Sequence, residues 1–137
     1  MKCIPVKAQA GITGFESPAA EYKELGLSLD QLLVRHPNTT FIGLAAGDSM
    51  QGLGIFDGDI LIVDRAVEPK HLDVIVANYN SEFVCKVIDL KKRQLLSAGR
   101  SFAPVNISEA DAFQLEGVVI SAVRLFRRND ELAKCMP

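Results

Sequence analysis

A serine in a glycine-rich turn is the first residue of this sequence that could do chemistry. Ser49 lies in the segment Gly47-Asp48-Ser49-Met50, directly after the apolar run TTFIGLA. An abrupt turn at the end of a buried strand can present a hydroxyl group and free backbone N–H groups together. A serine is a weak nucleophile at its normal acidity, so it needs a partner that takes its proton during attack. Ser49 is therefore a candidate nucleophile whose base has to be found elsewhere in the chain.

The two histidines do not suggest such a base. His36 precedes Pro37 at the end of a short helical pattern, and His71 lies in the loop VEPKHLD. Neither position indicates a preorganised imidazole, and a serine, a histidine and an aspartate in one chain are weak support for a triad. We interpret both histidines as solvated or capping side chains.

Lysine can act as the base when it is neutral, and burial favours the neutral form. In EFVCKVIDL, a period of two places Lys86 on one face with Val84 and Ile88. Lowering a lysine pKa to near 7 requires roughly 3.4 units, or about 4.6 kcal/mol. A lysine in a strand more often extends its amine to water. The pattern alone therefore leaves a catalytic and a solvent-facing Lys86 both open.

The elements that must position these residues are mainly strands. Apolar and β-branched runs alternate with polar turns, which is typical of a mainly antiparallel β domain. The predicted strands are TTFIGLA, DILIVD, DVIVANY, EFVCKVIDL, RQLLSA and FQLEGVVISAVRLF. The segment Asn78-Tyr79-Asn80-Ser81 predicts a hairpin between two of them.

A single short helix is predicted ahead of the strands. Ser28 can cap SLDQLLVRHP, Gln31 occupies the capping-box position, and Pro37 ends the helix. Residues 1–24 lack apolar periodicity and are interpreted as an extended N-terminal arm. The domain follows over 25–126, and the polar tail 127–137 could be a helical turn or disordered.

The composition limits the classes of function. The chain has 137 residues and 48% apolar residues, which suits one domain, and its formal charge of −2 disfavours direct nucleic-acid binding. Three cysteines without a CxxC pair predict neither a disulfide framework nor a zinc site, and no signal peptide or membrane anchor is visible. These features predict a soluble cytoplasmic protein that binds no membrane.

Two acidic residues, Asp57 and Asp59, could be mistaken for metal ligands. No calcium-loop spacing follows them, and an Asp-Gly-Asp turn before a strand explains them structurally. We predict no metal and no cofactor.

The order of the motifs GDSM, DGDILIVD and EFVCK resembles that of the UmuD, MucA and LexA group of self-cleaving proteins. The segments GFESPAAEY, LDQLLVRHPNTTF, APVNIS and GVVI are similar to UmuD segments, so that the resemblance covers residues 13–126. It implies twisted antiparallel sheets like those of the LexA/UmuD C-terminal domain. It also implies that Ser49 is the nucleophile and Lys86 its base. We expect the backbone N–H of Ser49, with that of Asp48 or Met50, to hold the oxyanion.

The family cuts its own arm before a glycine, and two such bonds are candidates here. Thr13-Gly14 matches the register of the following motif without a gap, although Thr13 is bulkier than the Cys or Ala that the family usually has. Ala10-Gly11 supplies the small residue but lies three residues earlier. We favour Thr13-Gly14 on register and keep Ala10-Gly11 as the alternative.

The resemblance also implies partners. RecA filaments on single-stranded DNA would stimulate cleavage, and the trimmed homodimer would join a UmuC-like Y-family DNA polymerase in mutagenic translesion synthesis. One alternative is a non-catalytic polymerase-accessory module with a vestigial dyad. Another is a truncated LexA-like repressor peptidase domain, although residues 1–24 cannot supply a helix-turn-helix.

Overall fold

The computed structural model describes residues 28–99 and 103–135 and divides the chain into two compact units, Met1–Arg35 and His36–Pro137. The described part of the first unit is a short helix, and the second unit contains the strands. Residues 1–24, interpreted above as an arm, lie outside the described residues. The division into arm, domain and tail therefore stays a prediction.

Helix α1 (Leu29–Leu33) begins at the predicted cap. The Ser28 hydroxyl accepts a hydrogen bond from the Gln31 backbone N–H at 3.1 Å, and the Gln31 side chain accepts one from the Ser28 N–H at 2.8 Å. This reciprocal pair is the capping box that the sequence predicts. The last helical residue is Leu33, because Val34 is extended. The helix therefore ends before it reaches Pro37, which was predicted to end it.

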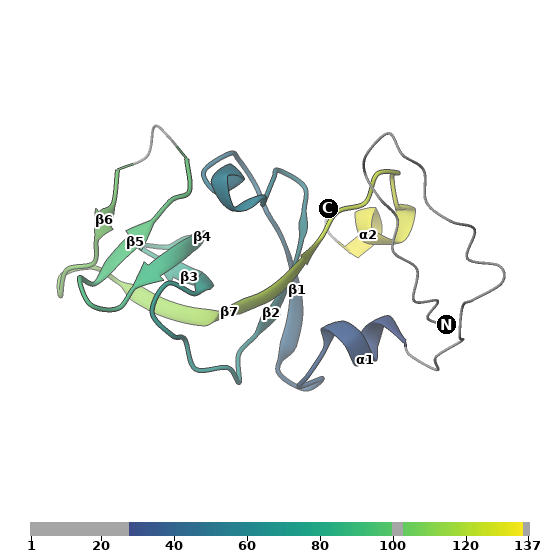
Figure 1. Cartoon of the computed structure of the whole chain (residues 1–137), viewed down its shortest axis with the longest axis horizontal. Coiled ribbons are helices and arrows are strands. Elements are labelled where there is room, and N and C mark those ends of the chain that lie inside the picture. Colours follow the sequence, from purple (N-terminus) through teal and green to yellow (C-terminus); the bar gives the residue numbers. More distant parts are fainter. Residues whose placement is uncertain (1–27, 100–102, 136–137) are drawn as a thin grey trace, which may run out of the picture. The chain divides into compact units, whose positions relative to one another are not determined.

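A seven-stranded sheet forms the second unit, with the order β1-β2-β7-β3-β4-β5-β6 and antiparallel pairing throughout (Figure 1). This confirms the mainly β fold. The strands are β1 (Thr40–Leu44), β2 (Ile60–Asp64), β3 (Val74–Tyr79), β4 (Glu82–Asp89), β5 (Gln94–Leu96), β6 (Val105–Asn106) and β7 (Phe113–Val123). The two-residue β6 and the 3-10 turn η2 (Gln51–Leu53) are additions to the predicted elements.

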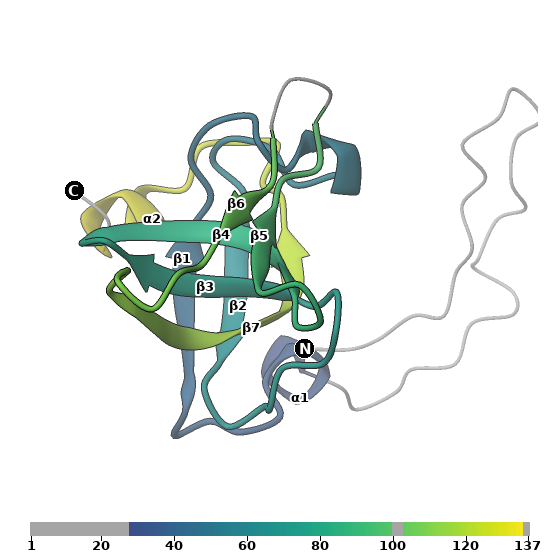
Figure 2. The ribbon, with the colours of Figure 1, turned by 90° about the vertical axis from the view of Figure 1, so that its left-hand side faces the viewer.

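Strand β7 joins two halves of this sheet. Its first part pairs with β3 and its second part with β2, and each pairing contains a register shift. Figure 2 shows β3 and β4 running across the direction of β1 and β2. A Cβ at Gly117, in the middle of β7, would lie only 2.7 Å from a methyl of Val63. The absent side chain therefore lets β2 and β7 approach closely where the sheet bends.

Two clusters of buried side chains lie on the two faces of β3 and β4. One contains Ile75, Ala77, Ile88, Leu95 and Val118, and the other contains Met50, Ile55, Leu61 and Val63. Strand β4 sends Val84 and Ile88 to the first cluster and Cys85 and Val87 to the second, in the alternation that the sequence predicts.

The hairpin between β3 and β4 turns at Asn80 and Ser81. Both residues have positive φ, 49° and 72°, and Tyr79 pairs with Glu82 across the turn. Two consecutive left-handed residues make the tight turn whose twist suits a hairpin. The predicted hairpin is thus confirmed, and it fixes the register that sets the face on which Lys86 lies.

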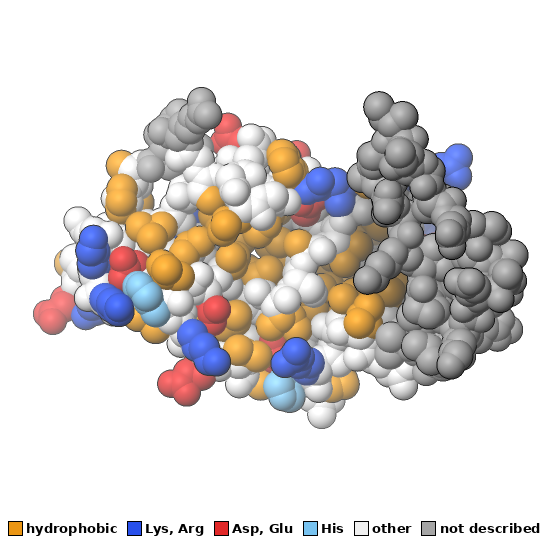
Figure 3. All heavy atoms as spheres, viewed as in Figure 1, with side chains coloured by type: hydrophobic (Ala, Val, Ile, Leu, Met, Phe, Trp, Pro, Cys, Tyr) orange, Lys and Arg blue, Asp and Glu red, His pale blue; other side chains and the backbone are white. Residues whose placement is uncertain are grey.

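The tail after β7 contains helix α2 (Asp130–Cys135), the helical one of the two predicted alternatives. Ahead of it, the Phe126 side chain is 94% exposed. Figure 3 shows further hydrophobic side chains gathered across the middle of the face seen in Figure 1. Among the helices of the described residues, none has the length and apolar character needed to cross a bilayer.

Candidate active site

The loop that carries Ser49 leaves β1 and turns at Gly47, which has φ 87°. The Gly47 N–H donates a hydrogen bond of 2.8 Å to the Asp57 carboxylate, so this acidic residue closes the turn. Just beyond, Met50 is 4% exposed and packs in the second core cluster. Ser49 is thus held between a fixed turn and a buried side chain.

The segment after β5 holds the other side of this loop. The Ala98 N–H donates to the Ser49 carbonyl at 2.8 Å, and the Gly52 N–H donates to the Ala98 carbonyl at 2.5 Å. A Cβ at Gly52 would overlap that carbonyl oxygen. Position 52 therefore needs a glycine because the two backbones approach too closely for a side chain.

An ion pair between the buried Asp59 and the exposed Arg124 fixes the chain that follows. Asp59, 2% exposed, accepts hydrogen bonds from the Arg124 guanidinium at 2.7 and 2.8 Å and from the Phe56 N–H at 2.8 Å. The hydrogen bonds from Arg124 are the main cause that lowers the pKa of Asp59. Arg124 also donates to the Gly54 carbonyl at 2.8 Å and stacks on Phe56. The end of β7 therefore anchors the loop by a two-pronged contact.

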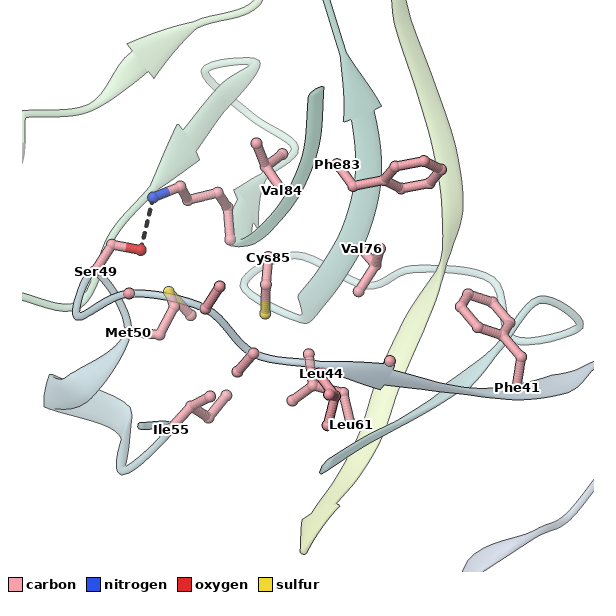
Figure 4. Close-up of a pocket in the computed structure, with 15 residues that line it drawn as sticks. Phe41, Leu44, Ser49, Met50, Ile55, Leu61, Val76, Phe83, Val84 and Cys85 are labelled. Atoms are coloured by element: carbon pink, nitrogen blue, oxygen red, sulfur yellow. Dashed lines mark hydrogen bonds between the residues drawn. The ribbon is translucent and has the colours of Figure 1, made fainter. Parts of the chain in front are cut away.

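Lys86 projects from β4 toward Ser49. Its Nζ donates a hydrogen bond to Ser49 Oγ at 2.9 Å, drawn as a dashed line in Figure 4, and one to Ser97 Oγ at 2.8 Å. The structure thus brings together the serine and the lysine that the sequence singles out, although they come from a loop and a strand far apart in the chain.

A pocket of about 340 Å³ opens beside this pair, and most of the side chains around it are apolar (Figure 4). Strand β1 forms one wall and β4 another. The lining residues are Phe41, Gly43, Leu44, Ala45, Ala46, Gly47, Ser49, Met50, Ile55, Leu61, Val76, Phe83, Val84, Cys85 and Lys86.

The titratable groups of the pocket respond to these surroundings. Burial lowers the pKa of Lys86, in the direction that a catalytic base requires, against a smaller opposing effect of Cys85. Burial raises the pKa of the Cys85 thiol to about 11, so that this group is neutral at physiological pH.

Three consecutive N–H groups at the turn have no hydrogen-bond acceptor within residues 28–99 and 103–135. Gly47 and Gln51 donate their N–H groups to Asp57 and to the Asp48 carbonyl. Between them, the N–H groups of Asp48, Ser49 and Met50 donate no hydrogen bond to any of the described residues. These are the three residues expected from the sequence to hold an oxyanion.

The histidines lie away from the pocket, since neither is among its lining residues. His71 accepts a hydrogen bond from the Leu90 N–H at 3.2 Å. The His36 side chain is 53% exposed, in agreement with its prediction as a solvated residue, and its Nδ1 also donates to the buried Asp64 carboxylate at 2.6 Å. This bond is the main cause that lowers the pKa of Asp64. A carboxylate buried at the end of β2 requires such a partner.

No group of three or more His, Cys, Asp or Glu side chains within the described part of the chain could hold a metal ion. Both candidate cleavage bonds, Thr13-Gly14 and Ala10-Gly11, lie outside the described residues.

Two contacts of the site were missed by sequence reasoning. Ser97 is the last residue but one of the predicted run RQLLSA, and Arg124 lies near the end of the predicted run FQLEGVVISAVRLF, but neither belongs to a motif that indicates chemistry. An arginine at the end of a strand and an Asp-Gly-Asp turn were the available signals for the ion pair. The contact of Ser97 had no signal in the sequence, because it depends on the pairing of β4 with β5.

Comparisons with known proteins identify the family of this chain. The model of the Peptidase S24-like family matches residues 3–120. Protein SamA of Salmonella typhimurium strain LT2 is 37% identical over 117 residues, which cover 85% of this chain and 82% of SamA. Protein MucA of Salmonella typhimurium is 36% identical over 118 residues, 85% of this chain and 81% of MucA.

A third relative matches a shorter stretch. Protein ImpA of Salmonella typhimurium is 39% identical over 92 residues, which cover 67% of this chain and 63% of ImpA, less than two thirds of that protein. Together these UmuD-like relatives support a protein related to SOS mutagenesis. The chain belongs to the Peptidase S24-like family, a family of serine peptidases.

Proposed function

We propose that this chain is a self-cleaving peptidase of the DNA-damage (SOS) response, in which Ser49 attacks a peptide bond of the chain's own N-terminal arm and Lys86 is the base. The observation that carries the proposal is the 2.9 Å hydrogen bond between Lys86 Nζ and Ser49 Oγ at the edge of an apolar pocket. A nucleophile and base within hydrogen-bonding distance are the geometric requirement of covalent catalysis by serine.

The reaction proceeds through an acyl-enzyme. Neutral Lys86 takes the proton of Ser49 Oγ while Ser49 attacks the carbonyl carbon ahead of the scissile glycine. The resulting ammonium returns the proton to the glycine nitrogen as the C–N bond breaks. Water, deprotonated by Lys86, then attacks the ester carbonyl carbon. The Lys86 ammonium gives this proton to Ser49 Oγ as the ester C–O bond breaks, which restores Ser49.

The turn N–H groups that have no acceptor in the described part of the chain suit the negative charge that develops in this reaction. Ser49 N–H, together with Asp48 or Met50 N–H, would donate to the oxyanion of the tetrahedral intermediate. Loss of one such donor commonly costs about 2.7 to 4 kcal/mol of transition-state stabilisation. Their lack of acceptors among the described residues supports this role.

Strand β1 offers a way to hold the substrate. It lies at one edge of the described sheet, and its residues Phe41, Gly43 and Leu44 line the pocket. An extended peptide can add to such an edge by backbone hydrogen bonds while its side chains enter pockets. The arm would be cut at Thr13-Gly14, with Ala10-Gly11 as the alternative bond.

The wider role follows from the relatives. We propose that RecA on single-stranded DNA stimulates cleavage and that the trimmed homodimer acts with a UmuC-like Y-family polymerase. The similarity to SamA, MucA and ImpA over most of the chain supports a role in SOS mutagenesis.

The test is the self-cleavage of the purified full chain, followed by intact mass. The unchanged protein should release one N-terminal fragment, whose mass separates a cut after Thr13 from one after Ala10. Ser49→Ala and Lys86→Ala should each slow the reaction roughly thousandfold or more. Matched controls are Ser121→Ala, whose buried Oγ has no described partner, and the exposed Lys91→Ala, both of which should cleave normally.

The pH dependence gives the dyad a second signature. Only the neutral amine of Lys86 can accept a proton, so the rate should rise about tenfold per pH unit while the ammonium form dominates, and then level off. Since burial lowers the pKa of Lys86, the midpoint should fall below 10.5. Cleavage by Ser49→Ala, or a rate independent of pH from 6 to 10, would rule out the dyad. No cleavage even with RecA, nucleotide and single-stranded DNA would instead indicate a vestigial site.

A further inference from the structure

Ser97 is the second hydroxyl group bound to Lys86. It follows β5 directly, is half-buried, and its Oγ accepts a hydrogen bond from Lys86 Nζ at 2.8 Å, a distance as short as that to Ser49. The next residue, Ala98, donates its N–H to the Ser49 carbonyl. One short segment therefore contacts both members of the proposed dyad.

We propose that Ser97 is a positioning residue that aims the lone pair of the Lys86 amine at Ser49. The inference rests on the proposed function, because it assumes that Lys86 is the base. A lysine amine rotates about the end of a flexible four-carbon chain. Anchoring one N–H on Ser97 restricts that rotation and favours orientations in which the lone pair faces Ser49 Oγ.

The proton balance fits this arrangement. Neutral Nζ carries two N–H bonds and one lone pair. One N–H remains on Ser97 throughout, the lone pair receives the Ser49 proton, and the proton later leaves to the scissile nitrogen. Ser97 neither gains nor loses a proton, so it acts through Lys86 and does not touch the reacting carbonyl.

The Ser97 hydroxyl should have an effect of its own on the pKa of Lys86. Cys85 is the other titratable side chain that lines the pocket, and its thiol is neutral over the working pH range; the side chain of Asp48, next to Ser49, is exposed. An acceptor hydroxyl stabilises an ammonium more than an amine. Loss of Ser97 Oγ should therefore lower the pKa of Lys86 while it loosens the orientation of the amine.

The test compares Ser97→Ala with Ser97→Thr, which keeps the hydroxyl, and with Ser121→Ala as a matched serine control. In Ser97→Ala, the first-order rate of self-cleavage on the alkaline plateau should fall roughly ten- to hundredfold, and the acidic limb should move to lower pH. Ser97→Thr should recover most of the rate. Tm is measured for each variant, so that a loss from unfolding is recognised.

Two results would overturn the proposal. One is an unchanged rate–pH profile in Ser97→Ala. The other is a loss that Thr does not restore and that follows Tm. Ser49→Ala and Lys86→Ala are assayed in parallel. If both are inactive while Ser97→Ala cleaves as fast as the unchanged chain, only the proposed role of Ser97 is contradicted. If Ser49→Ala or Lys86→Ala still cleaves, the proposed dyad is contradicted together with the role of Ser97.

A measurement without turnover completes the test. The pKa of Lys86 is followed by NMR of its labelled side chain in Ser49→Ala and in Ser49→Ala/Ser97→Ala. A lower pKa in the double variant supports the hydrogen bond to the ammonium, and an equal or higher one contradicts it.

Discussion

Ser49 lies on an irregular loop, whereas Lys86 lies in the middle of the eight-residue strand β4. The loop is held by contacts from three distant parts of the chain: the Asp57 carboxylate, the Ala98 backbone and the Arg124 guanidinium. The strand is held by regular pairing with β3 and β5 and by alternate side chains in two core clusters.

This difference predicts two kinds of response to mutation. Damage to the strand should unfold the domain, because its contacts are those of the core. Damage to the loop should move Ser49 relative to Lys86 while most of the core stays packed. Stability and self-cleavage therefore have to be measured side by side for each variant.

Ile88→Ala should have the largest effect and should act on stability. Ile88 is 5% exposed and lies two residues after Lys86 in the first cluster. Removal of a buried isoleucine side chain costs about 2 to 5 kcal/mol, and we expect the free energy of unfolding in urea to fall by about 3 kcal/mol. Leu90→Ala, at a position 47% exposed, is the control and should change it little. Equal losses in the two variants would contradict a core role for this face of β4.

Gly52→Ala should act on the loop instead. The new Cβ would overlap the Ala98 carbonyl oxygen. The loop that carries Ser49 would then have to move away from the segment that carries Ser97. A displacement of about 1 Å at a catalytic group can cost about hundredfold in rate, equivalent to about 2.7 kcal/mol. First-order cleavage rates should show this loss, whereas the free energy of unfolding should fall less than in Ile88→Ala.

The control for Gly52→Ala lies in the same 3-10 turn. Leu53 is 53% exposed and is not part of the pocket, so Leu53→Ala should cleave at the normal rate. If Gly52→Ala cleaved as fast as Leu53→Ala, the close approach of the two backbones would have no part in placing Ser49.

The same contrast explains what the sequence could predict. The face of Lys86 follows from the alternation of EFVCKVIDL and from the turn at Asn80 and Ser81, which are local features. The capping box at Ser28 is equally local. Such features depend on residues that are close together in the sequence, and the structure confirms them.

The contacts of the loop could not be predicted in this way. That Arg124 contacts Asp59 depends on the strand order, in which β7 lies beside β2. That Ser97 contacts Lys86 depends on the pairing of β4 with β5. Register shifts in β7 change which side chains meet, and periodicity does not reveal them. The resemblance to self-cleaving proteins indicated Ser49 and Lys86, but not the residues that hold them together.

Asp57→Ala should have the smallest effect, because it removes one hydrogen bond from the loop. Without the carboxylate, the Gly47 N–H loses its acceptor, and a bond of this kind contributes about 1 kcal/mol. Self-cleavage should slow roughly threefold to tenfold, and Asp57→Asn, which keeps an acceptor oxygen, should restore most of the rate. Asp73→Ala is the matched control, since Asp73 accepts from the Lys70 N–H in a turn outside the pocket. If Asp73→Ala slowed cleavage as much as Asp57→Ala, the effect would come from general loosening of the domain and not from the turn that presents Ser49.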